Sequence, residues 1–395
     1  MLKQIPIAEL VPGMYVNQVI KQSGRLKMRS KGLVKTEATI EQLKQKGIEL
    51  LEIDLKKSQI KEPNQPEANE AAPTRPKQKP QKSNSEQLTA ANDLYLQAVI
   101  IQGEFVDNLI KGSGADVDKV GELSQNIIDS IFDNNNAIRC LTLIKNTDEY
   151  LLEHSINCSI LMGVFARHMQ FDKALIEDLS LGALLMDVGM ATIPSDVFQK
   201  PGKLTKSDWQ IMHGHVDAGI ELLEQFEQLS DTVLDVIQNH HERMDGSGYP
   251  SAKEGQSIST YARMAAIVDC YDAMISDRHH QKGQTPTKVL RKLLTDTTLD
   301  QSLVQQFVKC VGVHPVGSLV KLKSEKLALV STAGKTDPLS PVVMTFYSLR
   351  SNTHAEIKRI DLSKSEDEIV SSVKPEEFKM NLTKFFREVF IHQVP

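Results

Sequence analysis

Histidine and aspartate side chains that could bind a metal are concentrated in the middle of the chain. Eight of the eleven histidines lie between residues 154 and 280. A lone histidine on a helix is usually a surface or core residue, but several on helices with converging apolar faces indicate a shared site. Imidazole and carboxylate groups together suit iron, manganese, nickel or zinc. The candidate ligands are His154, Asp187, His215, His240, His241 and Asp269.

Two of these candidates are aspartates placed in apolar segments. Asp187 follows the stretch LGALLM, and Asp269 interrupts MAAIVDCYDAM. Burying a carboxylate in such a segment is costly unless a partner or a metal compensates for it. A carboxylate between two ions can bridge them, and two ions roughly 3.5–4 Å apart can activate a water and clamp a phosphate. The pattern therefore favours a metal-dependent hydrolase site.

Not every histidine fits this site. His213 and His215 are two residues apart and point in different directions on a helix, so we expect only one of them to be a ligand. His168 is expected at the surface, as are His354 and His392 in the flanking segments.

The segment NHHERMDGSGYP joins two adjacent histidines to a loop. Asp245, Gly246 and Gly248 tolerate unusual backbone angles, and Pro250 ends the turn. A glycine pair alone is a weak signal, but its position directly after HHER makes the combination specific.

The elements that must position these residues are helical. Seven amphipathic patterns between about 92 and 312 predict a mainly α fold, an all-helical bundle over residues 91–312. Residues 1–55 predict a small β/α module, in which a helix over TIEQLKQKGIELLEIDL leads into a strand. Residues 56–90 hold many prolines and charges and predict a disordered linker. Residues 313–395 predict a β-rich module that ends in a short helix, PEEFKMNLTKFFREVF.

Composition excludes several classes of protein. The formal net charge of -5 and the pI near 6.2 argue against a partner that is a polymeric nucleic acid. No apolar run approaches the ~20 residues that a bilayer demands, and the first residues lack the core of a signal peptide, so we expect no membrane span and a cytoplasmic location. The cysteines form no C-x-x-C pair and are expected to be free thiols; they are Cys140, Cys158, Cys270 and Cys310.

These residues carry a resemblance to a known family. Residues 145–312 resemble the HD-GYP family of bacterial cyclic-di-GMP phosphodiesterases, a branch of the HD hydrolase superfamily, and the bundle is accordingly expected to be HD-type. Residues 1–55 resemble the small domain of unknown function that often precedes such hydrolases, and the β-rich tail is similar to the tail of the same architecture. The motifs that match are EYLLEHSINCSIL, LLMDVGMATIP, KPGKLT, MHGHVDAG, NHHERMDGSGYP and AAIVDCYDAMISDR.

The resemblance implies a metal site of one or two divalent ions, most often iron or manganese. It assigns Asp187 as the catalytic carboxylate that bridges both ions. One ion would keep Asp187, His215, His240 and His241. The other would be left with His154, Asp187 and Asp269. Tyr150 stands where some family members have a glutamate for a third ion, so we do not expect a trinuclear site.

The resemblance also implies the side chains that bind the substrate, cyclic-di-GMP or a related nucleotide. Arg278 matches the arginine that usually contacts a substrate phosphate. The family usually has a basic residue at the position of Gln281, and Lys282 could substitute for it. The loop that shapes one side of the site is Gly248, Tyr249 and Pro250.

Two departures put the activity in doubt. The family pattern His-Asp-x-Gly-Lys reads here Met186, Asp187, Val188, Gly189, Met190. A thioether is soft and uncharged and does not replace an imidazole on a hard divalent ion. Loss of a supporting partner of a metal costs ~10–100-fold in affinity or activity, and loss of a charge aimed at the transferred phosphoryl group costs on the order of 10²–10³ in rate. We therefore predict weak or absent hydrolysis.

The sequence leaves three alternatives open. The first is a degenerate HD-GYP protein that binds a nucleotide or partner with little turnover. The second is a working phosphodiesterase giving pGpG or GMP, in which water or a neighbouring residue completes the ligand shell. The third is an interaction scaffold that docks on diguanylate cyclases through residues 1–55, the linker and the GYP loop. The helices between 92 and 135 fit a homodimer seam or simply a bundle face.

Overall fold

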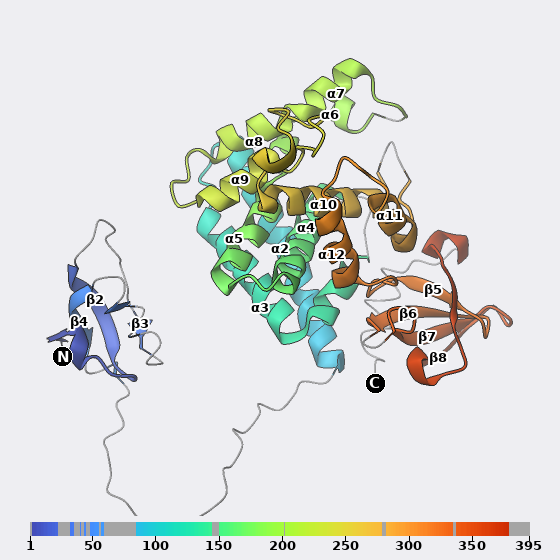
Figure 1. The fold of residues 1–395 in the computed structure, drawn as a ribbon, viewed down its shortest axis with the longest axis horizontal. Helices are drawn as coiled ribbons and strands as arrows, with labels where there is room; N and C mark the ends of the chain where they lie inside the picture. The colour runs from blue at the N-terminus through green and yellow to red at the C-terminus, as the bar shows by residue number, and fades with distance from the viewer. Residues whose placement is uncertain are drawn as a thin grey trace, which may run out of the picture. The chain divides into compact units, whose positions relative to one another are not determined.

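The computed structural model describes residues 2–22, 32–34, 40, 43–44, 48–54, 57–58, 84–143, 150–200, 202–278, 282–334 and 337–378. The chain divides into two compact units, Met1–Gln78 and Lys79–Pro395 (Figure 1). Most of the predicted linker 56–90 lies outside the described residues. So do most of the helix predicted before residue 48 and all but the first turn of the predicted terminal helix.

The first unit is built on an antiparallel sheet. Its described strands are β1 (Leu2–Pro6), β2 (Tyr15–Gln22), β3 (Gly32–Leu33) and β4 (Ile48–Asp54), in the order β1-β4-β2-β3, with a 3-10 turn η1 (Ile7–Glu9) after β1. In β4 the segment IELLEID buries Ile48, Leu51 and Ile53. Because these side chains meet Ile5 and Val16 in a small core, the sheet has one apolar face.

The second unit is mainly helical. Its described helices are α2 (Asn84–Lys111), α3 (Val117–Leu141), α4 (Tyr150–His168), α5 (Lys173–Leu185), η3 (Val188–Thr192), α6 (Ser195–Phe198), α7 (Lys206–His213), α8 (His215–Leu223), α9 (Asp231–Asn239), η4 (Gly255–Ser257), α10 (Thr260–Ile275), α11 (Pro286–Leu293) and α12 (Gln301–Val311). Several begin at a side chain that accepts a hydrogen bond from a backbone N–H of the first turn, which stabilises a helix start. These caps are Asp172, Thr205, Ser230 and Ser259.

Helix α4 forms the centre of the bundle. It is buried on every side from Glu153 to Ala166, and it packs against α5, α3 and α10. A helix with no solvent face is typical of the middle of a large core. In Figure 1 it lies among the other helices, with α6 and α7 at the far end of the bundle from the C-terminal sheet.

The C-terminal part is a five-stranded antiparallel sheet in the order β8-β7-β6-β5-β9. Alternation along β6 sends Leu327 and Leu329 into the core of the helical bundle, and Ala328 and Val330 into a small core on the opposite face. The sheet and the bundle therefore share one core. The strands are β5 (Leu319–Leu322), β6 (Lys326–Thr332), β7 (Val342–Ser348), β8 (Thr353–Asp361) and β9 (Ile369–Ser372). The 3-10 turn η5 (Leu362–Lys364) connects β8 to β9, and the 3-10 turn η6 (Pro375–Phe378) follows β9.

These elements confirm the mainly α fold with a small sheet near each end of the chain. One boundary differs from the prediction, because α2 begins at Asn84, inside the segment 56–90 that we expected to be linker. Its first turn, NSEQ, is as polar as the residues before it, so composition does not reveal the start. Among the described residues, no helix combines the length and the apolar character needed to cross a bilayer.

The bundle and the C-terminal sheet meet at a close backbone contact. On the bundle side, the guanidinium of Arg139 in α3 donates a hydrogen bond of 2.9 Å from Nη2 to the carbonyl oxygen of Val311, the last residue of α12 before the sheet. Gly317 has a φ of +91°, and a Cβ there would lie 2.7 Å from the carbonyl oxygen of Cys140. Only glycine fits this position, because both the backbone angle and the space exclude a side chain.

We predict that Gly317→Ala destabilises the second unit more than Gly312→Ala does. Gly312 also has a positive φ, +84°, but a Cβ there would meet nothing nearer than 3.7 Å. Both variants incur backbone strain of about 1–3 kcal/mol. Gly317→Ala adds a steric cost of about 1–3 kcal/mol. Denaturant unfolding measures the difference, and equal losses for the two variants would show that the contact with Cys140 does not matter.

Candidate metal centre

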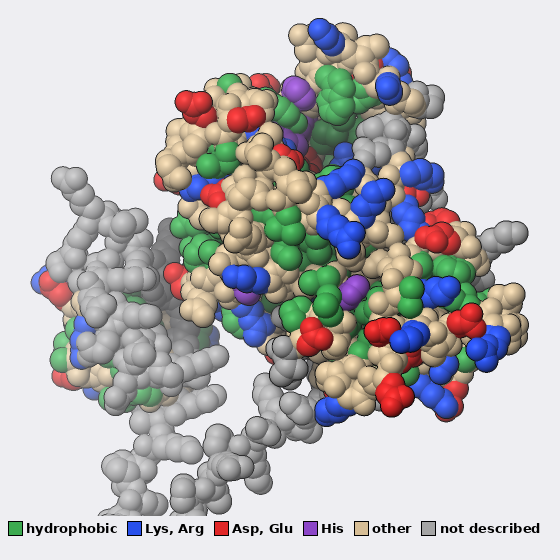
Figure 2. Space-filling view, turned by 45° about the vertical axis from the view of Figure 1, so that its right-hand side comes forward, with side chains coloured by type: hydrophobic (Ala, Val, Ile, Leu, Met, Phe, Trp, Pro, Cys, Tyr) green, Lys and Arg blue, Asp and Glu red, His purple; other side chains and the backbone are tan. Residues whose placement is uncertain are grey.

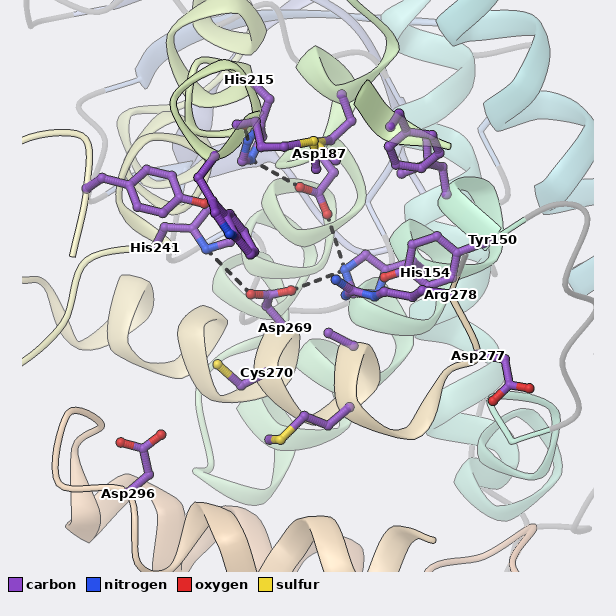
Figure 3. Close-up of a pocket in the computed structure, with 18 residues that line it drawn as sticks. Tyr150, His154, Asp187, His215, His241, Asp269, Cys270, Asp277, Arg278 and Asp296 are labelled. Atoms are coloured by element: carbon purple, nitrogen blue, oxygen red, sulfur yellow. Dashed lines mark hydrogen bonds and ion pairs between the residues drawn. The ribbon is translucent and has the colours of Figure 1, made fainter. Parts of the chain in front are cut away.

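The six residues predicted as metal ligands meet in one place, and all of them except His240 are drawn in Figure 3. They come from α4, the α5–η3 junction, the start of α8, the end of α9 and α10. His154 Nε2 lies 3.2 Å from both Asp187 Oδ2 and Asp269 Oδ1. His241 Nδ1 lies 3.6 Å from Asp269 Oδ2. The two carboxylates therefore stand among the imidazoles, as Figure 3 shows.

Asp187 is positioned by a glycine two residues further along. Helix α5 ends at Leu185, and Gly189 in η3 presses against α8. A Cβ on Gly189 would lie 2.0 Å from the carbonyl oxygen of His215 and 2.6 Å from the nitrogen of Gly219. This contact brings Asp187 Oδ1 to 3.3 Å from His215 Nε2.

Two histidines are oriented by backbone carbonyl groups. His215 Nδ1 lies 2.7 Å from the oxygen of Met212, and His240 Nδ1 lies 2.8 Å from the oxygen of Ile237. A carbonyl only accepts, so each Nδ1 carries the hydrogen, and in the neutral ring Nε2 is a lone pair. Each Nε2 then faces the site as a possible metal ligand.

These lone pairs converge on a carboxylate. The Nε2 atoms of His215 and His240 are 3.5 Å apart, and they lie 3.3 and 3.8 Å from Asp187 Oδ1. Three acceptors at such distances repel one another unless a cation stands between them. A proton on one ring or a metal ion bound by all three groups removes the repulsion.

The pKa values favour the metal-binding forms of most of these groups. Burial lowers the pKa of His240, and burial together with the charge of His240 lowers the pKa of His241 further. Burial opposes ionisation of Asp187, but hydrogen bonds from His154 and His215 hold its pKa well below the usual value. For His215, burial disfavours the charge, yet hydrogen bonding to Asp187 raises its pKa, so a metal ion bound here would have to displace a proton from this ring.

The donor atoms form two groups that share Asp187. Within each group the ligand atoms all lie within 4.8 Å of one another. Three imidazoles and a carboxylate make a donor set that fits iron, manganese or zinc. The larger group is Asp187, His215, His240 and His241, and the smaller is His154, Asp187 and Asp269. These are the two sets that the sequence analysis assigned, and their role as ligands stays a prediction.

His154, Cys158 and Asp272 form a third group of possible ligands. Asp272 is better explained as a residue that orients His154 than as a metal ligand. Asp272 Oδ2 lies 2.8 Å from His154 Nδ1, in the arrangement of carboxylate and histidine that often orients a metal ligand. Burial raises the pKa of Cys158 to about 12, so its thiol stays protonated. Sequence reasoning missed Asp272, although its spacing of three residues from Asp269 on α10 places both on one side of the helix.

The two methionines that differ from the family pattern, Met186 and Met190, occupy different environments. The side chain of Met186 is fully buried within the hydrophobic core and does not line the cavity beside the metal groups. Met190 does line that cavity. No histidine, cysteine or carboxylate among the described residues adds a fourth donor to the smaller group.

The cavity beside the metal groups has a volume of about 290 Å³. Arg278 lines it, with its guanidinium 4.9 Å above the ring of Tyr150, which in turn stacks on His154. Lys282 does not line the cavity: its exposed amine lies 2.9 Å from Asp277 Oδ2. Of the predicted substrate residues, the structure thus brings Arg278 and Tyr249 to the cavity, and leaves Lys282, Gly248 and Pro250 outside its lining.

The loop after His241 folds back onto the histidines. A Cβ on Gly248 would lie 2.5 Å from the carbonyl oxygen of His241, so glycine is required. The buried carboxylate of Glu242 accepts hydrogen bonds from the backbone N–H groups of Ser251 and Lys253, at 2.8 and 2.9 Å. These contacts fix the loop against the metal site.

Tyr249 is held between two imidazoles. Its ring stacks on His213 at 3.8 Å and 12°, and on His241 at 4.6 Å and 28°. His213 therefore packs on the loop, whereas His215 joins the metal group. We expected one ligand from this pair, but no sequence signal indicated that the other histidine would contact Tyr249.

We predict that Gly189→Ala disrupts the metal site. The added Cβ must displace α8 from η3, which costs about 1–3 kcal/mol of folding free energy, and the displacement separates Asp187 from His215. Metal analysis after loading with manganese or iron should show fewer ions per chain than in the wild type.

Gly121→Ala is the matched control. This glycine lies in α3 with no atom within 4 Å of an added Cβ, so alanine should stabilise the helix by up to about 1 kcal/mol and leave the metal content unchanged. An unaltered metal content in Gly189→Ala would mean that this contact does not position Asp187.

Comparisons with known proteins agree with this architecture. Residues 140–302 match the HD domain family, and residues 2–120 match a domain of unknown function, DUF3391. A cyclic di-GMP phosphodiesterase of Pseudomonas aeruginosa is 30% identical over 375 residues, which cover 92% of this chain and 90% of that protein. A 3′3′-cGAMP-specific phosphodiesterase of Vibrio cholerae is 36% identical over 111 residues, 28% of this chain and 21% of that protein.

A solved HD-GYP-type structure from Bdellovibrio bacteriovorus aligns with a TM-score of 0.46 and 17% identity, covering 78% of this chain and 99% of that one. The relative from Pseudomonas aeruginosa matches almost end to end, and the sequence contains the GYP loop. The chain belongs to the HD-GYP family of cyclic di-GMP phosphodiesterases.

Proposed function

We propose that this protein binds a cyclic dinucleotide of the cyclic di-GMP class and one firmly held divalent ion, and that it hydrolyses the nucleotide slowly. The observation that carries the proposal is the unequal filling of the two donor groups. Counted over the part of the chain that the structure describes, the larger group has four protein donors and the smaller has three. Met186, at the position of the missing ligand, is packed in the core.

The residues present suit the binding of an anionic ligand. Asp187, His215, His240 and His241 would hold the ion, iron or manganese by the family resemblance. A bound ion of this kind activates a water and neutralises phosphate charge. The guanidinium of Arg278 reaches the same cavity and can pair with a phosphate oxygen. Tyr249, fixed by its two stacking partners, lines one side of the cavity.

Two features support slow hydrolysis. Among the described residues the smaller group has no fourth protein ligand, and a ligand loss should cost at least the ~10–100-fold that a supporting partner costs. Met190 presents a thioether on the cavity wall where the family has a cation. A charge at such a position contributes on the order of 10²–10³ in rate. Both losses act on the same step, so their effects need not multiply.

A working phosphodiesterase that gives pGpG or GMP is the second candidate. The observation that favours it is that all six predicted ligand side chains are assembled, with the four-donor group complete. In this case a water would complete the smaller group. Docking of a diguanylate cyclase at the GYP loop, a homodimer and a cytoplasmic location stay predictions from the sequence.

We predict about one manganese or iron ion per chain after loading and dialysis, with slow turnover of cyclic di-GMP. The double variant Met186→His, Met190→Lys should hold a second ion and hydrolyse the nucleotide at least about 10²-fold faster, because it restores both a ligand and a charge. Metal analysis and chromatography of the products measure the two effects.

The matched control is Met186→Leu, Met190→Leu, which keeps the core apolar and adds neither ligand nor charge. It should behave like the wild type in metal content and turnover. Circular dichroism checks that the imidazole introduced at position 186 leaves the fold intact. Two ions per chain and rapid turnover in the wild type would establish the working phosphodiesterase instead.

A further inference from the structure

The only tryptophan of the chain lies on the wall of the metal-site cavity. Trp209 is in α7, and 47% of its surface is exposed although it lines the cavity. Figure 2 shows histidine and hydrophobic side chains together near the top of the view, where the molecule is hollowed. A large aromatic surface left open inside a concave site is typical of a position that a ligand covers.

Trp209 stands at the outer end of a series of rings. Its ring centroid lies 5.8 Å from that of His213, which stacks on Tyr249 at 3.8 Å. Tyr249 stacks in turn on His241, at 4.6 Å. Since His241 belongs to the four-donor group, this series connects the cavity wall to the metal site through direct ring contacts.

The start of α7 holds the tryptophan in place. Thr205 caps the helix and forms reciprocal hydrogen bonds with Asp208, the residue that directly precedes Trp209. Lys200 Nζ lies 2.6 Å from Asp208 Oδ2 and ties this turn to the segment after α6. The indole is therefore presented by a fixed turn, which lowers the entropy cost of binding a ligand against it.

The cavity around Trp209 has an apolar wall and a charged wall. Phe198, Met212 and Met190 make the apolar wall, and Arg278 supplies a positive charge on the other, beside the aspartates and histidines that line the same cavity. A ligand that satisfies both has a flat aromatic part and an anionic part. Nucleotides have this composition, and stacking of bases on aromatic side chains is a common way to bind them.

We propose that Trp209 stacks on a purine base of the cyclic dinucleotide whose phosphate lies at the metal site. This assignment rests on the proposed function, and it adds a base-binding surface on α7 that determines affinity. It also accounts for the series of rings, because His213 and Tyr249 support the indole from the side of the metal ligands.

The sole tryptophan makes the proposal measurable by fluorescence. Metal-loaded protein is titrated with cyclic di-GMP, and binding is measured independently by equilibrium dialysis with radiolabelled nucleotide. A stacked guanine should quench the emission of Trp209 over the concentration range in which dialysis shows binding. Inorganic phosphate, an anion without a base, should leave the emission unchanged.

Three variants test the contact itself. Trp209→Ala should weaken binding on the order of 10-fold, the loss expected for one stacked base, and Trp209→Phe should retain most of the affinity. Ile211→Ala is the matched control, because Ile211 is 39% exposed on the same helix but does not line the cavity. It should bind like the wild type. Thermal melts check that each variant is folded.

The outcomes separate this proposal from the function on which it rests. If the wild type binds without quenching, and Trp209→Ala binds equally well, the base contact is wrong and the nucleotide-binding function stands. If the metal-loaded wild type does not bind cyclic di-GMP, both are wrong. If Ile211→Ala loses as much affinity as Trp209→Ala, the effect belongs to α7 as a whole, and the stacking assignment fails.

Discussion

The repulsion between unprotonated imidazole nitrogens and a buried carboxylate is the constraint on which the rest of the site depends. His215 and His240 each have Nδ1 committed to a backbone carbonyl, so both Nε2 lone pairs face Asp187. Such an arrangement is stable only when one ring takes up a proton or a metal ion is bound by all three groups. The helices of the bundle provide the framework that holds these acceptors together, and the deep burial of α4 and α10 makes that framework rigid.

The same constraint explains why the substitution at position 186 matters while leaving the fold intact. Asp187 serves both donor groups, so the larger group stays complete whatever stands at 186. Methionine is flexible and apolar and fills the core well. The protein therefore keeps its packing and one set of ligands, and the deficiency is confined to the smaller group. The fold can therefore be stable even when the site has fewer ligands. For this reason, family membership alone does not decide whether the protein is active.

Much of the site could be predicted from sequence because its signals are local. Carboxylates inside apolar helices and histidines on converging helices indicate a buried polar cluster, and the structure places all six residues in one cluster. The contacts that were missed depend on tertiary structure. The stacking of His213 on Tyr249 requires the loop to fold back over His241. The position of Lys282 on Asp277 depends on where the chain turns after α10. The start of α2 was missed because its first turn is polar.

The five-stranded sheet shows a similar limit, since alternation along a strand reveals two faces but not what covers them. Leu327 and Leu329 face the helices, while Ala328 and Val330 face a second small core. A boundary at residue 313 follows the change from helix to strand, yet it cuts through a continuous hydrophobic interior. A fragment ending there would expose apolar side chains of the bundle to water and would be prone to aggregate. The tail thus acts as a folding partner of the helices, and an insertion or fusion at this junction would separate two parts of one hydrophobic core.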